Sequence, residues 1–351
     1  MSHNLVIQET DKGSFYCRSM SAQSIDLAQK LEKCHSCKNS STKAVICASG
    51  MSAISLSLHS ILSQHKSEKI NLIRGDELYC DTPRLTKSLH ETYNFTEYLL
   101  NVNDTEEINR VFDNLRSDIN ILFLESASNP SGDVFDFRMI PALRKKMKKL
   151  YVIVDNTWLT HVIFNPFDYD VDMVVLSLTK YYSGSQCICG AIVCKNKYFN
   201  KLFNCVKING LHVSPIHCEM VSQAMDTIED RMLKSSETTI KVAQYLAGLK
   251  GFSVRHASLP TDPSSKLSTL LYHKWENSIV YPSVISFMVP MKLNDAVAWM
   301  KSSGIKYETS YGCSYSRFDP WPIAIGDEKT LCRLAIGYDD SYQDIVSKIN
   351  A

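Results

Sequence analysis

The sequence lacks several features that would place it in other classes of protein. No run approaches the roughly 20 apolar residues that cross a membrane, and the amino terminus MSHNLVIQETDKG has no basic start followed by an apolar segment. The chain also has no excess of one charge, since it contains 38 Lys and Arg residues and 37 Asp and Glu residues. A formal charge of +1 gives no electrostatic field that would attract nucleic acid or an anionic membrane. These absences favour a cytoplasmic protein with no membrane or nucleic-acid partner.

Repeats and low-complexity tracts are also absent, and the twelve cysteines are scattered rather than spaced as in a small disulfide-bonded domain. We therefore expect reduced thiols. Cys34 and Cys37 have the spacing of half a zinc site, but no second pair of suitable spacing follows, so no metal site is expected. Cys187 and Cys189 alternate with Ile188 in a strand-like run and are expected to pack.

One dense positive run is present, made of Arg144, Lys145, Lys146, Lys148 and Lys149. It falls in a stretch near 137–149 that has the pattern of an amphipathic helix, with Ile140, Leu143, Met147 and Leu150 turned inward. We predict a solvated helix face here rather than a binding surface.

The pattern of apolar runs predicts an α/β fold. With 351 residues and 44% hydrophobic composition, the chain can bury a large core, and its length favours a large domain with a smaller one attached. Strand-like runs at 43–49, 68–75, 120–126, 150–156, 172–179 and 188–194 alternate with helical stretches at 51–64, near 105–117 and near 137–149. Such alternation predicts a mostly parallel sheet covered by helices on both faces.

The chain changes character after about residue 200. A long helical region leads to short strands after Gly251, a helix near 293–302 and a closing strand, which together predict a smaller α+β domain. The predicted division is 1–40, an N-terminal arm; 41–230, the large α/β domain; and 231–351, the C-terminal α+β domain.

Three polar residues follow the ends of predicted strands. Asn129, Asp155 and Lys180 all come at or just after apolar runs, and ligands of such sheets collect at the carboxyl ends of the strands. Lys180 stands beside two hydroxyls, Ser177 and Thr179. An amine, an acid and small donors are what pyridoxal 5'-phosphate (PLP) needs for its aldehyde, its pyridine nitrogen and its phosphate.

The turn Ser49-Gly50-Met51 lies where the first strand leads into a helix. A glycine at this point lets backbone N–H groups approach a phosphate at the positive end of the helix. A plain turn with a helix N-cap would look the same in sequence. The turn therefore supports a phosphate site only together with Lys180 and Asp155.

These segments resemble the Cys/Met metabolism PLP-dependent family, the group of cystathionine γ-synthase, cystathionine γ-lyase and methionine γ-lyase. The likeness runs from about Tyr16 to Asp340 and is strongest at 122–191, where LFLESASNPSG, VIVDNTW and VLSLTKYYSG follow in the order and spacing of the family's segments. The resemblance implies the aminotransferase-like fold, called fold type I. It makes Lys180 the Schiff-base lysine, Asp155 the partner of the pyridinium, and Ser177 and Thr179 phosphate ligands.

Further roles follow from the same resemblance. Asn129 would contact the cofactor and the substrate, and Tyr79, in DELY, would stack on the cofactor ring and assist catalysis. The turn Ser49-Gly50-Met51 would hold the phosphate, with the backbone amides of Gly50 and Met51 as ligands. Ser310, in TSYG, and Arg333, in CRLAIG, would bind the substrate's α-carboxylate.

The amino-terminal arm has its own implied role. Tyr16-Cys17-Arg18-Ser19 is similar to a family segment that reaches the phosphate of a neighbouring subunit. Tyr16 and Arg18 would then complete a partner's site, and a homodimer or homotetramer is expected.

Several departures from the family pattern concern the substrate. Thr309 stands where many cystathionine-handling members carry glutamate, Cys80-Asp81 replaces two glycines after the tyrosine, and Ser185-Gln186 lies in a rebuilt loop after Lys180. The stretch between Ser310 and Arg333 is shorter than usual.

We expect an enzyme that acts on a small amino acid by γ-replacement on an O-activated homoserine. Two alternatives are left open: γ- or β-elimination of the lyase kind, and a PLP-binding member without turnover. The family contains both reaction outcomes, and pocket shape rather than the catalytic residues decides between them.

Overall fold

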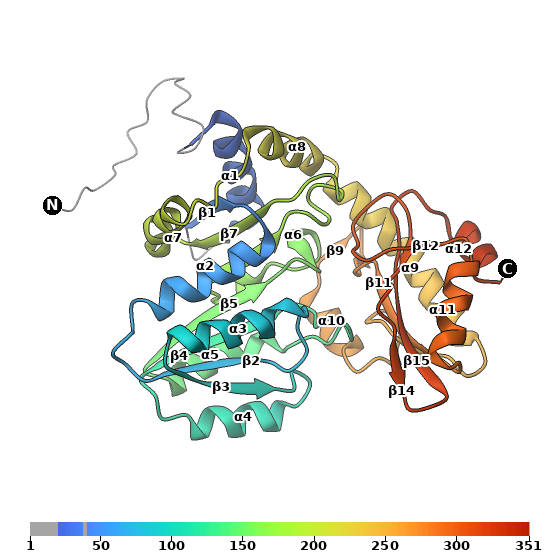
Figure 1. Cartoon of the computed structure of the whole chain (residues 1–351), viewed down its shortest axis with the longest axis horizontal. Helices are drawn as coiled ribbons and strands as arrows, with labels where there is room; N and C mark the ends of the chain where they lie inside the picture. The colour runs from blue at the N-terminus through green and yellow to red at the C-terminus, as the bar shows by residue number, and fades with distance from the viewer. Residues whose placement is uncertain (1–19, 38–40, 351) are drawn as a thin grey trace.

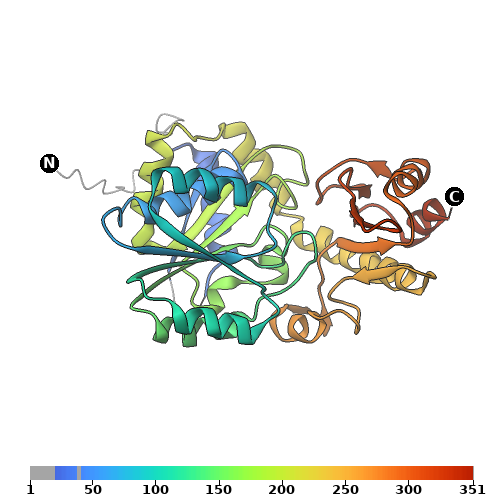
Figure 2. The same ribbon diagram turned by 60° about the horizontal axis from the view of Figure 1, so that its bottom comes forward.

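The computed structural model describes residues 20–37 and 41–350. Tyr16 and Arg18 therefore lie outside the described residues, as does most of the predicted arm. Two sheets lie side by side along the long axis of the molecule, and the long helix α9 (Ile228–Gly248) runs from one toward the other (Figures 1 and 2). The boundary predicted at 230/231 falls in the first turn of this helix.

The large domain is built on a seven-stranded sheet of order β1-β7-β6-β5-β4-β2-β3. Its strands are β1 (Thr42–Cys47), β2 (Ile70–Gly75), β3 (Phe95–Leu100), β4 (Ile119–Glu125), β5 (Lys149–Asp155), β6 (Met173–Ser177) and β7 (Gly190–Lys195). Strands β2 to β6 pair in parallel, and β7 pairs antiparallel with both β6 and β1. The predicted mostly parallel sheet is confirmed.

Helices cover both faces of this sheet because the side chains of each strand alternate between two cores. In β4, Leu122 and Leu124 point into one core, and Ile121 and Phe123 into the other. The first core is covered by α1 (Ala22–Cys34), α4 (Thr105–Asn114), α5 (Ile140–Lys146), α6 (Thr160–Ile163) and α8 (Pro215–Met225). The second is covered by α2 (Gly50–Leu62), α3 (Asp81–Thr92) and α7 (Asn196–Ile208). Two short 3-10 helices, η1 (Phe137–Met139) and η2 (Pro166–Tyr169), complete the domain.

The C-terminal domain packs helices on a second sheet, of order β12-β13-β15-β11-β8, with β14 paired to β15. Its strands are β8 (Ser253–Arg255), β11 (Val284–Val289), β12 (Lys306–Tyr307), β13 (Arg317–Phe318), β14 (Ile323–Ile325) and β15 (Lys329–Ala335). Helices α9, α11 (Leu293–Ser302) and α12 (Tyr342–Ile349) contribute to its core, α10 (Ser265–Leu271) lies toward the large domain, and β9 (Lys274–Trp275) and β10 (Ser278–Ile279) form a small hairpin. The predicted α+β character is confirmed.

The helix predicted near 137–149 is wrong in its extent. It is divided into η1 and α5, it ends at Lys146, and Lys149 already begins β5. Arg144 is not a solvated residue: its guanidinium pairs with the buried Asp172 at 2.7 Å and with Asp170 at 2.9 Å. The apolar spacing that suggested one helix came from two elements, since Leu150 is buried by the sheet.

No helix in the described part of the chain is long and apolar enough to cross a membrane.

Candidate active site at the carboxyl ends of the central strands

The carboxyl ends of three adjacent strands bring polar residues to one cavity. Glu125, Asp155 and Ser177 are the last residues of β4, β5 and β6, and Glu125 lies beside Asp155 in the parallel register. Lys180 follows Ser177 in the turn after β6, and its amine reaches the same space. The cavity has a volume of about 250 Å³, and its position is where an α/β sheet of this order collects ligands.

Nine of the predicted site residues line this cavity: Ser49, Gly50, Met51, Tyr79, Asn129, Asp155, Ser177, Thr179 and Lys180. Two more touch members of that set. The Lys180 Nζ donates to the Ser310 Oγ at 2.8 Å, and the Arg333 Nη1 donates to the Asn129 Oδ1 at 2.8 Å. The structure thus brings together all predicted site residues that it describes, and their roles stay predictions.

Burial sets the protonation behaviour of Lys180. It lowers the pKa of the amine to about 8, and the positive charges of Arg333 and Arg317 add to the effect, whereas Asp319 and Asp155 oppose it. The ring of Tyr311 lies against the amine, with Nζ 5.2 Å from the ring centroid. The lowered pKa gives Lys180 a larger neutral fraction at neutral pH than an ordinary lysine has, which suits an attack on an aldehyde and the transfer of protons.

Two carboxyls, the buried Glu125 and the half-buried Asp155, lie next to each other at the ends of β4 and β5. Burial raises the pKa of Asp155 to about 6, although hydrogen bonds from Thr157 and the charge of Lys180 act in the opposite direction. Burial and the negative charge of Asp155 raise the pKa of Glu125 well above its usual range. Ionising Asp155 in this cavity costs free energy, because the carboxylate is poorly solvated and lies beside Glu125. A cation bound next to Asp155 would offset that cost.

Glu125 was not predicted from the sequence. Its Oε1 accepts the backbone N–H of Tyr79 at 2.7 Å, and the Asn129 N–H also donates to its carboxyl. Glu125 thereby fixes the backbone of Tyr79 and Asn129, two residues that are predicted to contact the cofactor. Its position could have indicated this role, because Glu125 ends a predicted apolar strand just as Asp155 does.

Two aromatic residues that were not predicted, Trp158 and Tyr311, also line the cavity, together with Ile54, Ala127, Thr157 and Ile188. Trp158 and Tyr311 face each other with ring centroids 5.8 Å apart, and Tyr181 lies behind Tyr311 at 5.3 Å. Tyr79 lies at the cavity with 40% of its surface exposed.

The turn before α2 is pressed tightly against β6. A Cβ atom added to Gly50 would lie 2.6 Å from the Cβ of Ser177 and 3.0 Å from its Oγ. Gly50 is also the first residue of the 13-residue helix α2, so its end of the helix carries unpaired N–H groups and a partial positive charge. This cradle fits a phosphate, and only glycine leaves room for it.

Two of the predicted phosphate ligands have their hydroxyls engaged elsewhere. The Ser49 Oγ caps α2 by accepting the Ser52 N–H at 3.1 Å. The Thr179 Oγ1 donates to the carbonyl of Cys189 and accepts the N–H of the same residue, each at 3.2 Å. Within the described residues, Ser177 and the amides of the turn are therefore the groups best placed to meet a phosphate.

Amine, acid and phosphate cradle all face the one cavity, and together they match the chemical demands of PLP. Lys180 offers a nucleophile for the aldehyde, Asp155 a half-buried carboxylate for the ring nitrogen, and the turn at Gly50 an anion site. The residues present fit the cofactor.

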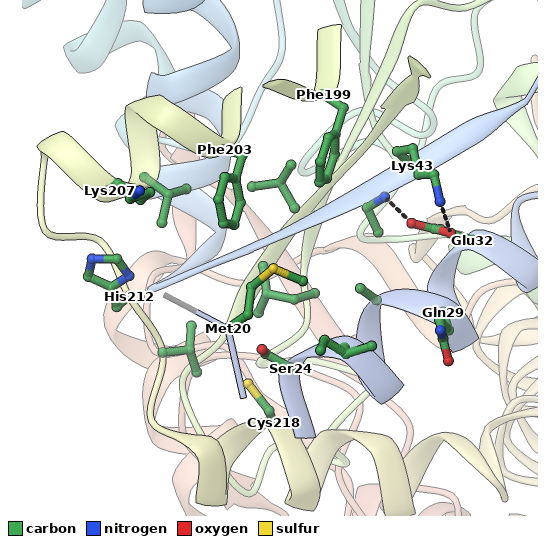
Figure 3. A pocket seen from close by; sticks show the side chains of 17 residues that line it. Met20, Ser24, Gln29, Glu32, Lys43, Phe199, Phe203, Lys207, His212 and Cys218 are labelled. Carbon is green, nitrogen blue, oxygen red and sulfur yellow. Dashed lines mark hydrogen bonds and ion pairs between the residues drawn. The ribbon is translucent and has the colours of Figure 1, made fainter. Parts of the chain in front are cut away.

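A second cavity of about 300 Å³ lies away from this site, along β1 between α1 and α7. Figure 3 shows Phe199 and Phe203 of α7 on one side of it and Met20 and the α1 residues on the other, with Glu32 paired to Lys43 at 3.3 Å. None of the predicted site residues that the structure describes lines it.

Comparison with known proteins gives a family and a fold. The family model described as "Cys/Met metabolism PLP-dependent enzyme" matches residues 2–318. Among curated proteins, cystathionine beta-lyase of Schizosaccharomyces pombe is 29% identical over 232 residues, which are 65% of this chain and 57% of that protein. L-methionine gamma-lyase of Porphyromonas gingivalis is 28% identical over 203 residues, 56% of this chain and 50% of that protein. The chain thus spans about half the length of the curated relatives it matches.

Solved structures show the same fold at lower identity. Cystathionine gamma synthase from Xanthomonas oryzae pv. oryzae, in complex with aminoacrylate and cysteine, has a TM-score of 0.84 at 22% identity and covers 98% of this chain and 89% of its own. A putative O-acetylhomoserine (thiol)-lyase from Campylobacter jejuni, solved with a pyridoxyl-lysine phosphate, has a TM-score of 0.81 at 21% identity, covering 97% and 88%. The predicted fold is confirmed.

Proposed function

The chain belongs to the Cys/Met metabolism PLP-dependent enzyme family, and we propose that it binds PLP through Lys180 and catalyses γ-replacement on an O-activated homoserine. The observation that carries the proposal is the meeting of the Lys180 amine, Asp155 and the Gly50 turn in one cavity. The relatives named above span both synthases and lyases, so the outcome of the reaction is the part that experiment has to decide.

Each residue of the site has a task in this proposal. Asp155 supplies the negative charge that keeps the ring nitrogen protonated, and PLP, when bound, takes up the electron pair left at the substrate's Cα. Lys180, with its lowered pKa, takes the Cα proton and returns a proton later. Arg333 offers a guanidinium to the α-carboxylate and is oriented by Asn129.

Loss of a second proton from Cβ and departure of the γ-substituent would follow in this reaction. A nucleophile then adds at Cγ, or hydrolysis yields a 2-oxo acid and ammonia. The second outcome is γ-elimination, and the alternative to replacement is γ- or β-elimination: L-methionine gamma-lyase among the relatives supports the first and cystathionine beta-lyase the second. Thr309 brings no carboxylate to a distal ammonium group, which favours a nucleophile without an amino group of its own over cysteine.

The test is a substrate screen on the purified, PLP-loaded protein. O-acetyl-, O-succinyl- and O-phosphohomoserine are each offered with L-cysteine or with sulfide, and cystathionine and methionine are offered alone. Mass spectrometry of the products distinguishes replacement from release of a 2-oxo acid. The variant K180A should form neither product, and borohydride reduction of wild type followed by peptide mapping should place the cofactor on Lys180.

Three results would contradict the proposal. Labelling of another lysine would remove its basis. Release of 2-oxo acid from every substrate, with no replacement product, would establish the lyase alternative. Cofactor absorbance that stays unchanged with every amino acid would favour a PLP-binding protein without turnover.

A further inference from the structure

Arg333 already has a carboxylate partner within its own domain. Its backbone carbonyl accepts the N–H of Asp319 at 3.0 Å, next to the pairing of Phe318 with Leu334 that joins β13 to β15. The two side chains then form an ion pair between the Arg333 Nη2 and the Asp319 Oδ2, and they are only 14% and 13% exposed. The pair therefore joins β15 to the residue that follows β13, and it is largely withdrawn from water.

The other side of Arg333 faces the candidate active site. Its Nη1 donates to Asn129, which lines the cavity, and its positive charge adds to burial in lowering the pKa of Lys180. The guanidinium thus stands between an internal carboxylate and the place where a substrate's carboxylate would enter.

Asp319 is incompletely satisfied in this arrangement. Its second oxygen, Oδ1, is buried and has no hydrogen-bond partner among the described residues. A carboxylate that approaches Arg333 would meet this oxygen's negative charge in surroundings of low dielectric, where like charges repel strongly. Arg317, whose charge also lowers the pKa of Lys180, has a buried Nε without a partner among the same residues.

We propose that Asp319 is an internal competitor for Arg333, which sets the affinity of the site for the α-carboxylate of its substrate. The inference rests on the proposed function in assigning Arg333 to that carboxylate. In the folded protein Asp319 already neutralises the charge of Arg333. The α-carboxylate of an incoming amino acid therefore has to share Arg333 with Asp319 or displace Asp319 from it. Asp319 is then a residue that determines substrate affinity without being needed for the chemistry.

The experiment compares PLP-loaded wild type and the variant D319N in binding L-alanine, followed by the change in cofactor absorbance. L-alanine carries the α-carboxylate and has no γ-substituent to lose, so binding is measured apart from replacement or γ-elimination. We expect D319N to bind L-alanine on the order of tenfold more tightly, the change that about 1.4 kcal/mol of binding free energy produces. The control D327N removes the same charge from an exposed turn of the same domain and should bind as wild type does.

Two further measurements keep the result decisive. Because the charge of Asp319 raises the pKa of Lys180, D319N should shift the pH midpoint for PLP capture by the cofactor-free protein to lower pH. In the R333M background, D319N should change the affinity for L-alanine by less than twofold. The guanidinium for which Asp319 and the α-carboxylate compete is absent there. If D319N does not fold, D319S is measured in its place.

Unchanged or weaker binding of L-alanine by D319N would overturn the proposal, and weaker binding would show that Asp319 positions Arg333 instead. A wild-type protein that binds L-alanine but transforms no homoserine derivative would contradict the proposed reaction while leaving this comparison valid. The two ideas can therefore fail separately.

Discussion

Substitution of Gly50 by alanine tests the phosphate cradle most directly. The new Cβ would lie 2.6 Å from the Cβ of Ser177 and 3.0 Å from its Cα, whereas carbon atoms in contact prefer about 3.5 to 4.0 Å. The turn and β6 must therefore separate by about 1 Å. Forcing an extra methyl group into a packed site costs about 1 to 3 kcal/mol, and a misplacement of about 1 Å can reduce catalysis about a hundredfold.

Chemical denaturation of the cofactor-free protein should show that loss in unfolding free energy for G50A, and absorbance titration should show weakened PLP binding. The control is G248A, because a Cβ at Gly248, the last residue of α9, meets nothing within 4 Å. It should leave both measurements as in wild type or add a few tenths of a kcal/mol of stability.

A second substitution distinguishes steric pressure from other causes. In the double variant G50A/S177G the Cβ of Ser177 is gone, so part of the stability of the cofactor-free protein should return, although the Cα of residue 177 still lies 3.0 Å from the added Cβ. PLP affinity should stay low, since the Ser177 hydroxyl is lost with it. The reasoning is refuted if G50A is as stable as wild type and binds PLP equally well, or if S177G brings no recovery of stability.

Three other predictions follow from the site. The rate of PLP capture by the cofactor-free protein, followed by stopped-flow absorbance, should rise with pH and level off above about 8, since only the neutral Lys180 amine attacks. R333M should move the midpoint of this pH profile upward, because the charge of Arg333 lowers the pKa of Lys180. E125Q should lose less unfolding free energy than E125A, because burial and Asp155 raise the pKa of Glu125 well above its usual range and an amide carbonyl can still accept the Tyr79 N–H, while E125A should lose about 1 to 3 kcal/mol; equal stability of the two variants would contradict this role. G312A should lose at least about 2 kcal/mol of unfolding free energy, because Gly312 has φ +85° and an added Cβ would lie 2.6 Å from the nitrogen of Tyr181; a wild-type denaturation curve would argue against it.

Much of the large domain could be predicted from local pattern. Buried parallel strands are nearly continuous apolar runs, so β4, β5 and β6 were recognisable, and the polar residues at their ends stood out. Since strand ends meet at one edge of a parallel sheet, the positions of Asp155 and Lys180 along the chain were enough to place them together. Helix α3 was missed because its 12 residues bury only Thr82 and Thr86 and carry no strong apolar stripe.

Other features depend on contacts that no local pattern carries. Glu125 became important only when the fold brought the Tyr79 loop over the end of β4. The Ser49 hydroxyl is engaged by the first turn of α2, and the Thr179 hydroxyl by the backbone of Cys189, the residue before β7.

The sequence by itself determined the family, the order of the strands along the chain and the residues most able to hold PLP, because these are carried by short segments at fixed spacing. Only the tertiary structure decided that Arg333 is shared between Asn129 and Asp319. That sharing arises from the register of β13 against β15 and from the approach of the C-terminal sheet to the end of β4, which are long-range packing choices.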